Sequence, residues 1–249
     1  MTKVLPDAPR LRADILLVER GFFDSRSRAQ AAISAGLVTA NGTPVRKAAD
    51  LIARDAVIQA TEPYAYVSRG GVKLAAALDA FGIDPADRIC LDVGASTGGF
   101  TEVLLTRGAA RVYAVDVGRG QLHPRIFGNP RVVSLESTDA RALDRTLVPE
   151  PVDVLVADVS FISLRLVLPR VVDLLAAQSA LAVLIKPQFE AGPAHVRKGI
   201  VRDDGVRRTV CREMEAFVTA LGFRVIGVEP SPIEGGDGNR EFLLGARRG

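Results

Sequence analysis

The chain has 249 residues, of which 48% are hydrophobic and 24% charged, enough for a soluble protein with a sizeable core. Its two cysteines are too few for a disulfide framework, which favours a reducing compartment. The most apolar stretch, 171–185, contains polar residues and is shorter than a membrane-spanning helix, and the N-terminus lacks the apolar centre of a signal peptide. We therefore expect a cytoplasmic protein without a membrane segment.

Positive charge is concentrated at the start of the chain. Residues 1–61 hold nine Lys or Arg and six Asp or Glu, whereas residues 62–249 hold twenty-three of each. The net charge of +3 therefore lies in the first quarter. A locally basic module is typical of a surface that meets a polyanion, although so short a segment can also reach this balance by chance.

The first module, 10–61, is predicted to contain two helices followed by short strands. Apolar periodicity indicates a helix over 13–20, and a second helix over 26–34 follows possible capping residues. Asn41-Gly42, between two β-prone pairs, is a strong hairpin signal. A proline in 62–66 disfavours a helix there, so this segment is predicted to be a linker.

From residue 67 to 249 the chain alternates between strand and helix patterns. Strand-like runs occur at Ile89–Val93, Arg111–Val117, Val132–Leu135, Val152–Ala157, Ala180–Ile185, Arg224–Val228 and Glu241–Gly245. Helical patterns occur at Val72–Phe81, Gly99–Arg107, Leu164–Ala177 and Gly205–Leu221. Seven strands with intervening helices predict an α/β fold, a doubly wound sheet with helices on both faces. The last two strands are joined by a loop only, so the final strand is predicted to be antiparallel, as in class I methyltransferases.

A glycine-rich loop follows the first strand of this sheet. Its spacing, D-x-G-x-x-x-G-G, differs from the G-x-G-x-x-G that seats a pyrophosphate. S-adenosylmethionine carries no phosphate, but its ammonium group favours a carboxylate, which the acid before the loop supplies. The predicted cofactor contacts in this stretch are Asp92, Gly94, Ser96, Thr97, Gly98, Gly99 and Phe100.

Three further acids follow the next three strands. Asp116 is placed to accept the two ribose hydroxyls of a nucleoside, and Asp139 is suited to the adenine amino group. Asp158 ends the fourth strand and is also assigned to the cofactor site. The alternative is that these acids only cap helices or lie in turns.

Four residues are predicted to form the catalytic group, namely Lys73, Asp158, Lys186 and Glu241. Lys186 is the informative member because it ends a buried six-residue strand, where an ammonium is costly unless it is paired. Burial and a second nearby cation would favour the neutral amine, which can take a proton from a sugar hydroxyl during methyl transfer. Asp158 and Glu241 could hold the two lysines in place.

Other chemistries fit less well. The prolines that follow the corresponding acid in amino-group methyltransferases are missing after Asp158, and no Pro-Cys nucleophile suits transfer to cytosine C5. His123 and His195 have no metal-ligand spacing with the cysteines, so no metal is expected.

Taken together, these motifs resemble the TlyA family, often called hemolysin A, whose members are rRNA cytidine 2′-O-methyltransferases. The resemblance extends from Arg12 to about Leu244 and is carried by 66–74, 92–100, 157–163 and 185–190. The second domain is similar to the FtsJ-like ribose methyltransferases, whose Lys-Asp-Lys-Glu tetrad corresponds to Lys73, Asp158, Lys186 and Glu241.

The first domain resembles the RNA-binding fold named after the fourth protein of the small ribosomal subunit. The resemblance implies that basic side chains grip ribosomal RNA phosphates, which positions RNA without reading its sequence. A segment over 189–202 is predicted to be a mobile loop whose cations close over RNA. The predicted RNA-binding residues are Arg12, Arg26, Arg28, Arg46, Lys47, Arg69, Arg197 and Lys198. Each of the first-domain cations could instead be an ordinary surface charge.

Three other functions remain open at this stage. They are a membrane-active hemolysin, an RNA-binding assembly factor without catalysis, and a methyltransferase that acts on a base. No apolar span or strongly amphipathic basic helix supports the first, and the intact lysines and glycine loop argue against the second.

Overall fold

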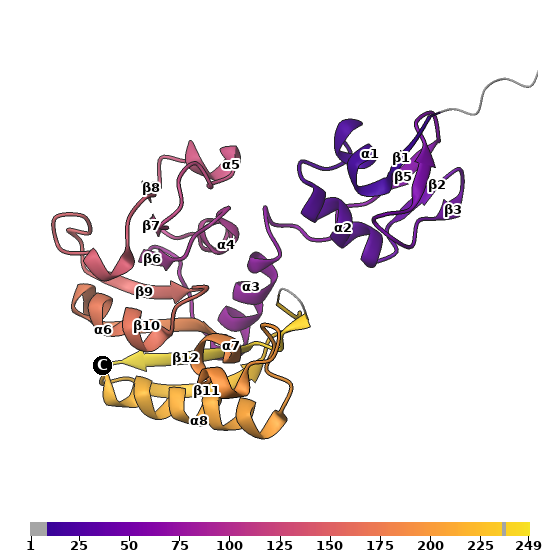
Figure 1. The fold of residues 1–249 in the computed structure, drawn as a ribbon. Coiled ribbons are helices and arrows are strands. Elements are labelled where there is room, and N and C mark those ends of the chain that lie inside the picture. The colour runs from indigo at the N-terminus through magenta and orange to yellow at the C-terminus, as the bar shows by residue number, and fades with distance from the viewer. Residues whose placement is uncertain (1–8, 236–237) are drawn as a thin grey trace, which may run out of the picture. The chain divides into compact units, whose positions relative to one another are not determined.

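The computed structural model describes residues 9–235 and 238–249. Its chain divides into two compact units, Met1–Ala65 and Tyr66–Gly249, each with its own fold (Figure 1).

The first unit combines two helices with short strands. Its elements are β1 (Arg10–Arg12), α1 (Ala13–Glu19), α2 (Arg26–Ser34), β2 (Val38–Ala40), β3 (Thr43–Pro44), β4 (Leu51–Ala53) and β5 (Ile58–Ala60). The strands form the antiparallel pair β1–β4 and a sheet of order β3-β2-β5. The predicted helices are confirmed, whereas β1, β4 and β5 were missed because three-residue strands show too little alternation to detect.

Local sequence signals explain where α2 and the hairpin form. The Ser25 side chain accepts a hydrogen bond from the Arg28 amide and so caps α2. Asn41 and Gly42 have φ values of 49° and 75°, and Ala40 pairs with Thr43 on either side of them. These left-handed conformations suit Asn and Gly, so the predicted two-residue hairpin is confirmed.

The second unit is built on one seven-stranded sheet. Its strands are β6 (Ile89–Val93), β7 (Arg111–Val115), β8 (Val132–Leu135), β9 (Val152–Ala157), β10 (Leu175–Ile185), β11 (Arg224–Pro230) and β12 (Phe242–Arg248). They lie in the order β11-β12-β10-β9-β6-β7-β8. Strand β12 pairs antiparallel with both β10 and β11, while the pairs among β6 to β10 are parallel. The predicted sheet with a reversed last strand is confirmed.

Helices cover both faces of this sheet (Figure 1). They are α3 (Gly70–Phe81), α4 (Gly99–Thr106), α5 (Pro124–Phe127), α6 (Leu164–Val171), α7 (Pro187–Glu190) and α8 (Asp204–Ala220), with short 3-10 turns η1 (Ala140–Ala142), η2 (Val172–Leu174) and η3 (Pro193–His195). Residues of α3 and α4 share one apolar core with the β-strand residues that point to their side, and residues of α6 and α8 share the other. Successive side chains of β6 alternate between the two cores, as they must in a strand.

The helix expected over 164–177 is shorter than predicted. It ends at Val171, a 3-10 turn follows, and β10 begins at Leu175, which pairs with Val152 of β9. Pro169 lies inside α6 and removes a backbone donor, which weakens the helix beyond it. The strand therefore begins at Leu175, where it pairs with β9, although the helix was predicted to continue to residue 177. Apolar periodicity alone could not show where the helix gives way to the strand.

A glycine contact between α3 and β12 gives a test of this packing. A Cβ added at Gly245 would lie 2.2 Å from the Phe81 ring, whereas one at Gly192 would have no neighbour within 4 Å. Because the crowded site must overpack, we expect Gly245→Ala to lower the free energy of unfolding by about 1–3 kcal/mol. Urea denaturation measures the change. Gly192→Ala is the matched control, and equal stability of the two variants would contradict this packing.

Candidate active site

The candidate site lies along one edge of the seven-stranded sheet. Asp116 and Asp158 directly follow β7 and β9, and Lys186 directly follows β10. Glu241 directly precedes β12, which runs in the opposite direction, so it lies at the same edge. Ile185 is paired with Phe242, and Lys186 and Glu241 are the next residues along the two strands. Sheet topology therefore collects residues that are distant in sequence.

Two ion pairs form a row at this edge. The Lys186 ammonium lies 2.6 Å from Asp158 Oδ1 and donates to Ser160 Oγ at 2.8 Å. The Lys73 ammonium, from α3, donates to Glu241 Oε2 at 2.5 Å. Both lysines are less than one-tenth exposed. Each buried ammonium is thus neutralised by a carboxylate, as desolvation requires.

The glycine loop packs directly against the segment that carries Asp158. Gly94 has φ +84°, and a Cβ there would lie 2.7 Å from the Asp158 carbonyl oxygen. Asp116 Oδ2 accepts a hydrogen bond of 2.8 Å from the Ser96 amide and so holds the loop to the end of β7. Position 94 therefore admits only glycine without a rearrangement.

Asp92 lies beneath the loop and is fully buried. Its Oδ2 accepts a hydrogen bond of 2.6 Å from the Thr101 hydroxyl, while its Oδ1 has no hydrogen-bond partner among the described residues. Burial raises the pKa of Asp92 to about 7, against the opposing effect of the Thr101 hydrogen bond. An unsatisfied, desolvated carboxylate oxygen is suited to a cationic group.

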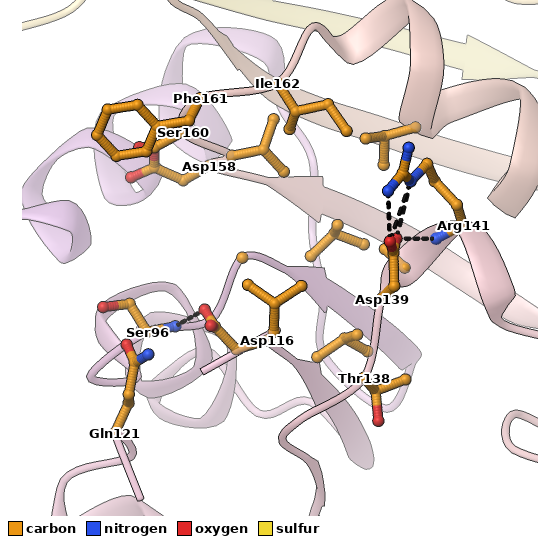
Figure 2. A pocket seen from close by; sticks show the side chains of 17 residues that line it. Ser96, Asp116, Gln121, Thr138, Asp139, Arg141, Asp158, Ser160, Phe161 and Ile162 are labelled. Carbon is orange, nitrogen blue, oxygen red and sulfur yellow. Dashed lines mark hydrogen bonds and ion pairs between the residues drawn. The ribbon is translucent and has the colours of Figure 1, made fainter. Parts of the chain in front are cut away.

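A cavity of about 490 Å³ opens between the glycine loop and the segment after β9 (Figure 2). Five of the residues predicted to contact a cofactor line it: Gly94, Ser96, Asp116, Asp139 and Asp158. Figure 2 shows Asp158, Ser160 and Phe161 on one wall and Ser96, Asp116 and Gln121 on another.

The other predicted loop residues do not line this cavity. Phe100 is buried in the apolar core, and Gly99 packs against Ser68, whose hydroxyl would be 2.1 Å from an added Cβ. Gly98, with φ +93°, is the N-cap residue directly before α4. The Thr97 carbonyl accepts a hydrogen bond from the His123 amide. These residues shape the loop and anchor it to its surroundings.

Asp139 is already engaged within the chain. Its carboxylate accepts hydrogen bonds from the Arg141 guanidinium, with the shortest at 2.6 Å, and from the Arg141 amide (Figure 2). The Arg141 hydrogen bonds lower the pKa of this carboxyl group. Arg141 therefore lies beside Asp139 at the cavity wall, which spacing did not indicate.

Ser160 and Phe161 are two further site residues that sequence reasoning missed. Ser160 receives the Lys186 hydrogen bond, and the Phe161 side chain is 91% exposed with φ +63°. A bulky residue in the left-handed region is an outlier that marks functional sites. No spacing signal precedes it; only backbone geometry and exposure reveal it.

Comparison with known proteins identifies the fold that carries this site. Residues 66–248 match the model of the FtsJ-like methyltransferase family. The chain belongs to this family. Residues 11–58 match the model of the S4 domain.

One curated relative matches nearly the whole chain, including both domains. The chain is 44% identical over 243 residues to the 16S/23S rRNA (cytidine-2′-O)-methyltransferase TlyA of Mycobacterium tuberculosis, covering 96% of this chain and 91% of the relative. This confirms the predicted membership of the TlyA family.

Solved structures agree with the family assignment. A provisionally named hemolysin of Streptococcus thermophilus has a TM-score of 0.77 and 40% identity, covering 96% of this chain and 89% of its own. A provisionally named S-adenosylmethionine-dependent methyltransferase of Listeria monocytogenes shares the fold at 16% identity, with a TM-score of 0.52, over 71% of this chain and 100% of its own.

In the S4 domain, several predicted RNA-binding arginines are held by acids. Arg12 and Arg26 both pair with the fully buried Asp14, at 3.0 and 2.7 Å. These pairs lower the pKa of Asp14, the Arg12 hydrogen bond most of all. Both arginines keep an exposed part, 42% and 55% of the side chain.

Arg28 differs from a surface cation. Its side chain is buried, donates to Glu62 at 2.5 Å and to the Tyr64 carbonyl at 3.2 Å, and lies over the Tyr64 ring at 4.8 Å. The sequence predicted that Arg28 contacts phosphate. In the structure its guanidinium instead joins α2 to residues 62–66, the segment predicted as a linker.

The remaining predicted RNA-binding residues are exposed. Arg46 and Lys47 lie in a turn whose amides donate to Asp50 Oδ2. Arg69 directly precedes α3. Arg197 and Lys198 lie in a tight turn over 197–200, and the Gly199 carbonyl in this turn accepts a hydrogen bond from the Asn239 side chain.

Residues 9–235 and 238–249 contain neither a metal-binding group nor a membrane-spanning helix. No group of three His, Cys, Asp or Glu side chains could hold a metal ion there. No helix in this part of the chain is long and apolar enough to cross a membrane.

The Lys73–Glu241 pair of this FtsJ-like domain can be tested by stability measurements. Because Lys73→Met leaves the buried Glu241 carboxylate without a counter-charge, we expect a loss of about 3–5 kcal/mol in the free energy of unfolding. The double variant Lys73→Met/Glu241→Gln should recover much of this loss. Urea denaturation measures both.

The exposed pair between Arg54 and Glu19 provides the control, since both side chains are about half exposed. Arg54→Met should change the free energy of unfolding by about 1 kcal/mol or less. A Lys73→Met variant as stable as Arg54→Met would show that the buried pair is not needed for folding.

Proposed function

We propose that this FtsJ-like methyltransferase uses S-adenosylmethionine to methylate the 2′-hydroxyl of a cytidine ribose in ribosomal RNA. The proposal depends above all on the placement of the Lys186 ammonium. It lies at the sheet edge, buried, and paired with Asp158, a residue that also lines the cavity beside the glycine loop. One acid thus belongs to both the cofactor cavity and the catalytic row.

The residues around the cavity fit S-adenosylmethionine. Asp92 does not itself line the cavity, but Val93 and Gly94, which follow it, do. The Asp92 Oδ1 atom, which has no partner among the described residues, offers a negative charge to an ammonium group. Within the described part of the chain, the Asp116 carboxylate accepts from the backbone amides of Ser96 and Gly118, which leaves lone pairs for ribose hydroxyls. Gly94 lets the backbone approach the ligand closely. Thr97, Gly98, Gly99 and Phe100 would act indirectly, by shaping the loop.

The adenine end of the cofactor would lie near Asp139. Its carboxylate is oriented by three donors of Arg141, and the one lone pair that they leave can accept a hydrogen bond from an amino group. When bound, the cofactor supplies an electrophilic methyl group on a sulfonium centre.

Lys186 is the proposed base. For this role the ammonium paired with Asp158 must first release a proton to solvent. The neutral Lys186 amine would then take the hydroxyl proton as the ribose oxygen bonds to the methyl carbon and the bond from that carbon to sulfur breaks. The Asp158 carboxylate then stabilises the ammonium that results. Lys73 and Glu241 would keep the end of the neighbouring strand in place. Alignment of the ribose oxygen, the methyl carbon and the sulfur would then provide much of the rate acceleration.

The exposed Phe161 ring is placed to contact RNA beside the cavity. An aromatic face that stays in water offers a stacking surface for an unpaired nucleobase. Stacking there would hold the attached ribose near Lys186.

The basic residues of the S4 domain complete the proposal. Arg12, Arg26, Arg46 and Lys47 would contact phosphates, joined by Arg69 and by Arg197 and Lys198 of the catalytic domain. The curated relative named above acts on cytidines of 16S and 23S rRNA, which suggests the substrate. An enzyme of ribosomal RNA works where ribosomes are, so we place it in the cytoplasm.

The base assignment can be tested with Lys186→Ala. Because this change removes the proton acceptor but leaves the cavity wall, we expect methyl transfer to ribosomal subunits to fall by about 10²–10⁴-fold while cofactor binding survives. Transfer is measured with tritiated S-adenosylmethionine, binding by calorimetry, and ribose methylation by nuclease resistance of the modified linkage. Retained activity would refute Lys186 as the base.

Asp92 predicts a pH dependence of cofactor binding. Its pKa is raised to about 7, so the carboxylate becomes protonated as pH falls through that value and loses its attraction for the ammonium group. We expect the affinity for S-adenosylmethionine at pH 5.5 to be about tenfold lower than at pH 8. Asp92→Asn should bind weakly at both pH values.

Methylthioadenosine is the matched control ligand, since it has the same nucleoside but no amino-acid end. Calorimetry should show no change in its affinity over the same range. An equal pH effect on both ligands would remove Asp92 as the ammonium partner.

A further inference from the structure

Two short segments carry Asp158 and Lys186 away from the sheet. The β9 segment, 158–164, leads from β9 into α6, and the β10 segment, 186–190, leads from β10 through α7. At their sheet ends they are joined by Lys186, through its contacts with Asp158 and Ser160.

The far ends of the two segments are joined by Glu190. Its Oε2 accepts a hydrogen bond of 2.5 Å from the Ser163 hydroxyl, and its Oε1 accepts one of 2.8 Å from the Leu164 amide. The Glu190 side chain is only 2% exposed. Ser163 in turn caps α6 by accepting from the Arg165 amide, so the acid and the hydroxyl together close the first turn of this helix.

Between these two connections the segments meet through aromatic rings. The centroids of Phe161 and Phe189 lie 5.2 Å apart, within the range of favourable aromatic contact. Phe161 also has φ +63°, a conformation that persists only where the surroundings hold it. Along the β9 segment, Phe161 thus lies between the residues that contact Lys186 and those that contact Glu190.

We propose that Glu190 is a positioning residue for methyl transfer, which holds the β9 segment so that Asp158, Ser160 and Phe161 face the Lys186 amine. This inference rests on the function proposed above. Glu190 reaches neither the cavity beside the glycine loop nor the lysine itself in the described structure, and it acts through the segment that it binds.

A carboxylate accepts from both donors, whereas an amide does so only if the Ser163 hydroxyl, which already accepts from the Arg165 amide, changes from donor to acceptor. Ionised glutamate accepts at both oxygens, whereas glutamine accepts at one and presents donors at the other, opposite either the Ser163 hydroxyl or the Leu164 amide. Burial raises the pKa of Glu190, and these two hydrogen bonds oppose that rise. Arg165, at 3.9 Å, is the nearby cation, and it also pairs with Glu213 of α8.

The test uses the full-length variant Glu190→Gln, with steady-state methylation of ribosomal subunits and separate calorimetry of S-adenosylmethionine. Since this change disrupts one of the two hydrogen bonds that Glu190 accepts from the β9 segment, we expect kcat to fall about tenfold. The cofactor Kd should stay within about twofold of wild type, because the glycine loop is untouched. This separation of kcat from cofactor affinity is not expected of a general loss of folding.

Two further variants complete the experiment. Ser163→Ala removes one donor of the same connection and should also lower kcat, and the double variant with Glu190→Gln should be less than additive because both act through one contact. Glu213→Gln is the matched control, since it removes the exposed partner of Arg165 and should leave kcat unchanged.

The outcomes are distinguishable. A kcat for Glu190→Gln equal to wild type overturns the inference, as does a loss of kcat that is matched by an equal loss of cofactor affinity. If Glu190→Gln does not fold, Ser163→Ala decides by the same criteria. A wild-type protein that methylates no ribosomal RNA would instead overturn the proposed function itself.

Discussion

The pairing of the Lys186 ammonium with the Asp158 carboxylate is the interaction on which the site depends. An ammonium at the end of a buried strand loses most of its hydration, and only a nearby negative charge makes that placement tolerable. The acid comes from the end of the neighbouring strand β9, so the pair exists only when β9 and β10 lie side by side. Formation of this ion pair therefore depends on the pairing of the two strands.

Close backbone contact places this pair against the cofactor cavity. The loop after β6 passes so near the Asp158 carbonyl that Gly94 has no room for a side chain. The Asp158 side chain lines the cavity as it contacts Lys186. In the proposed mechanism, a methyl donor in the cavity and the Lys186 base would thus meet without a large movement, which is the positioning that methyl transfer needs.

The two units treat their charges in different ways. In the second unit, the buried Lys73 and Lys186 are each paired with a carboxylate at one edge of the sheet. In the S4 domain, Asp14 gathers Arg12 and Arg26 and holds their guanidinium groups in a defined place. Fixed cations lose less conformational freedom when they bind a phosphate than free ones do. Arg28, by contrast, is buried and paired with Glu62, so its charge is used within the domain.

The sequence alone was sufficient for the class of fold, the seven strands and four longer helices of the second unit, the family and the type of chemistry. Strand and helix periods, the glycine loop and the acids and lysines after strands are local patterns, and a local pattern needs no knowledge of distant contacts. Tertiary structure decided which charges are paired. It paired Asp139 with Arg141 and Arg28 with Glu62. It placed residues 175–177 in a strand rather than a helix, and that strand begins where Leu175 pairs with β9. It also exposed Phe161 and enclosed Glu190, because burial and partners depend on what the rest of the chain brings near, and spacing along the sequence carries no record of that.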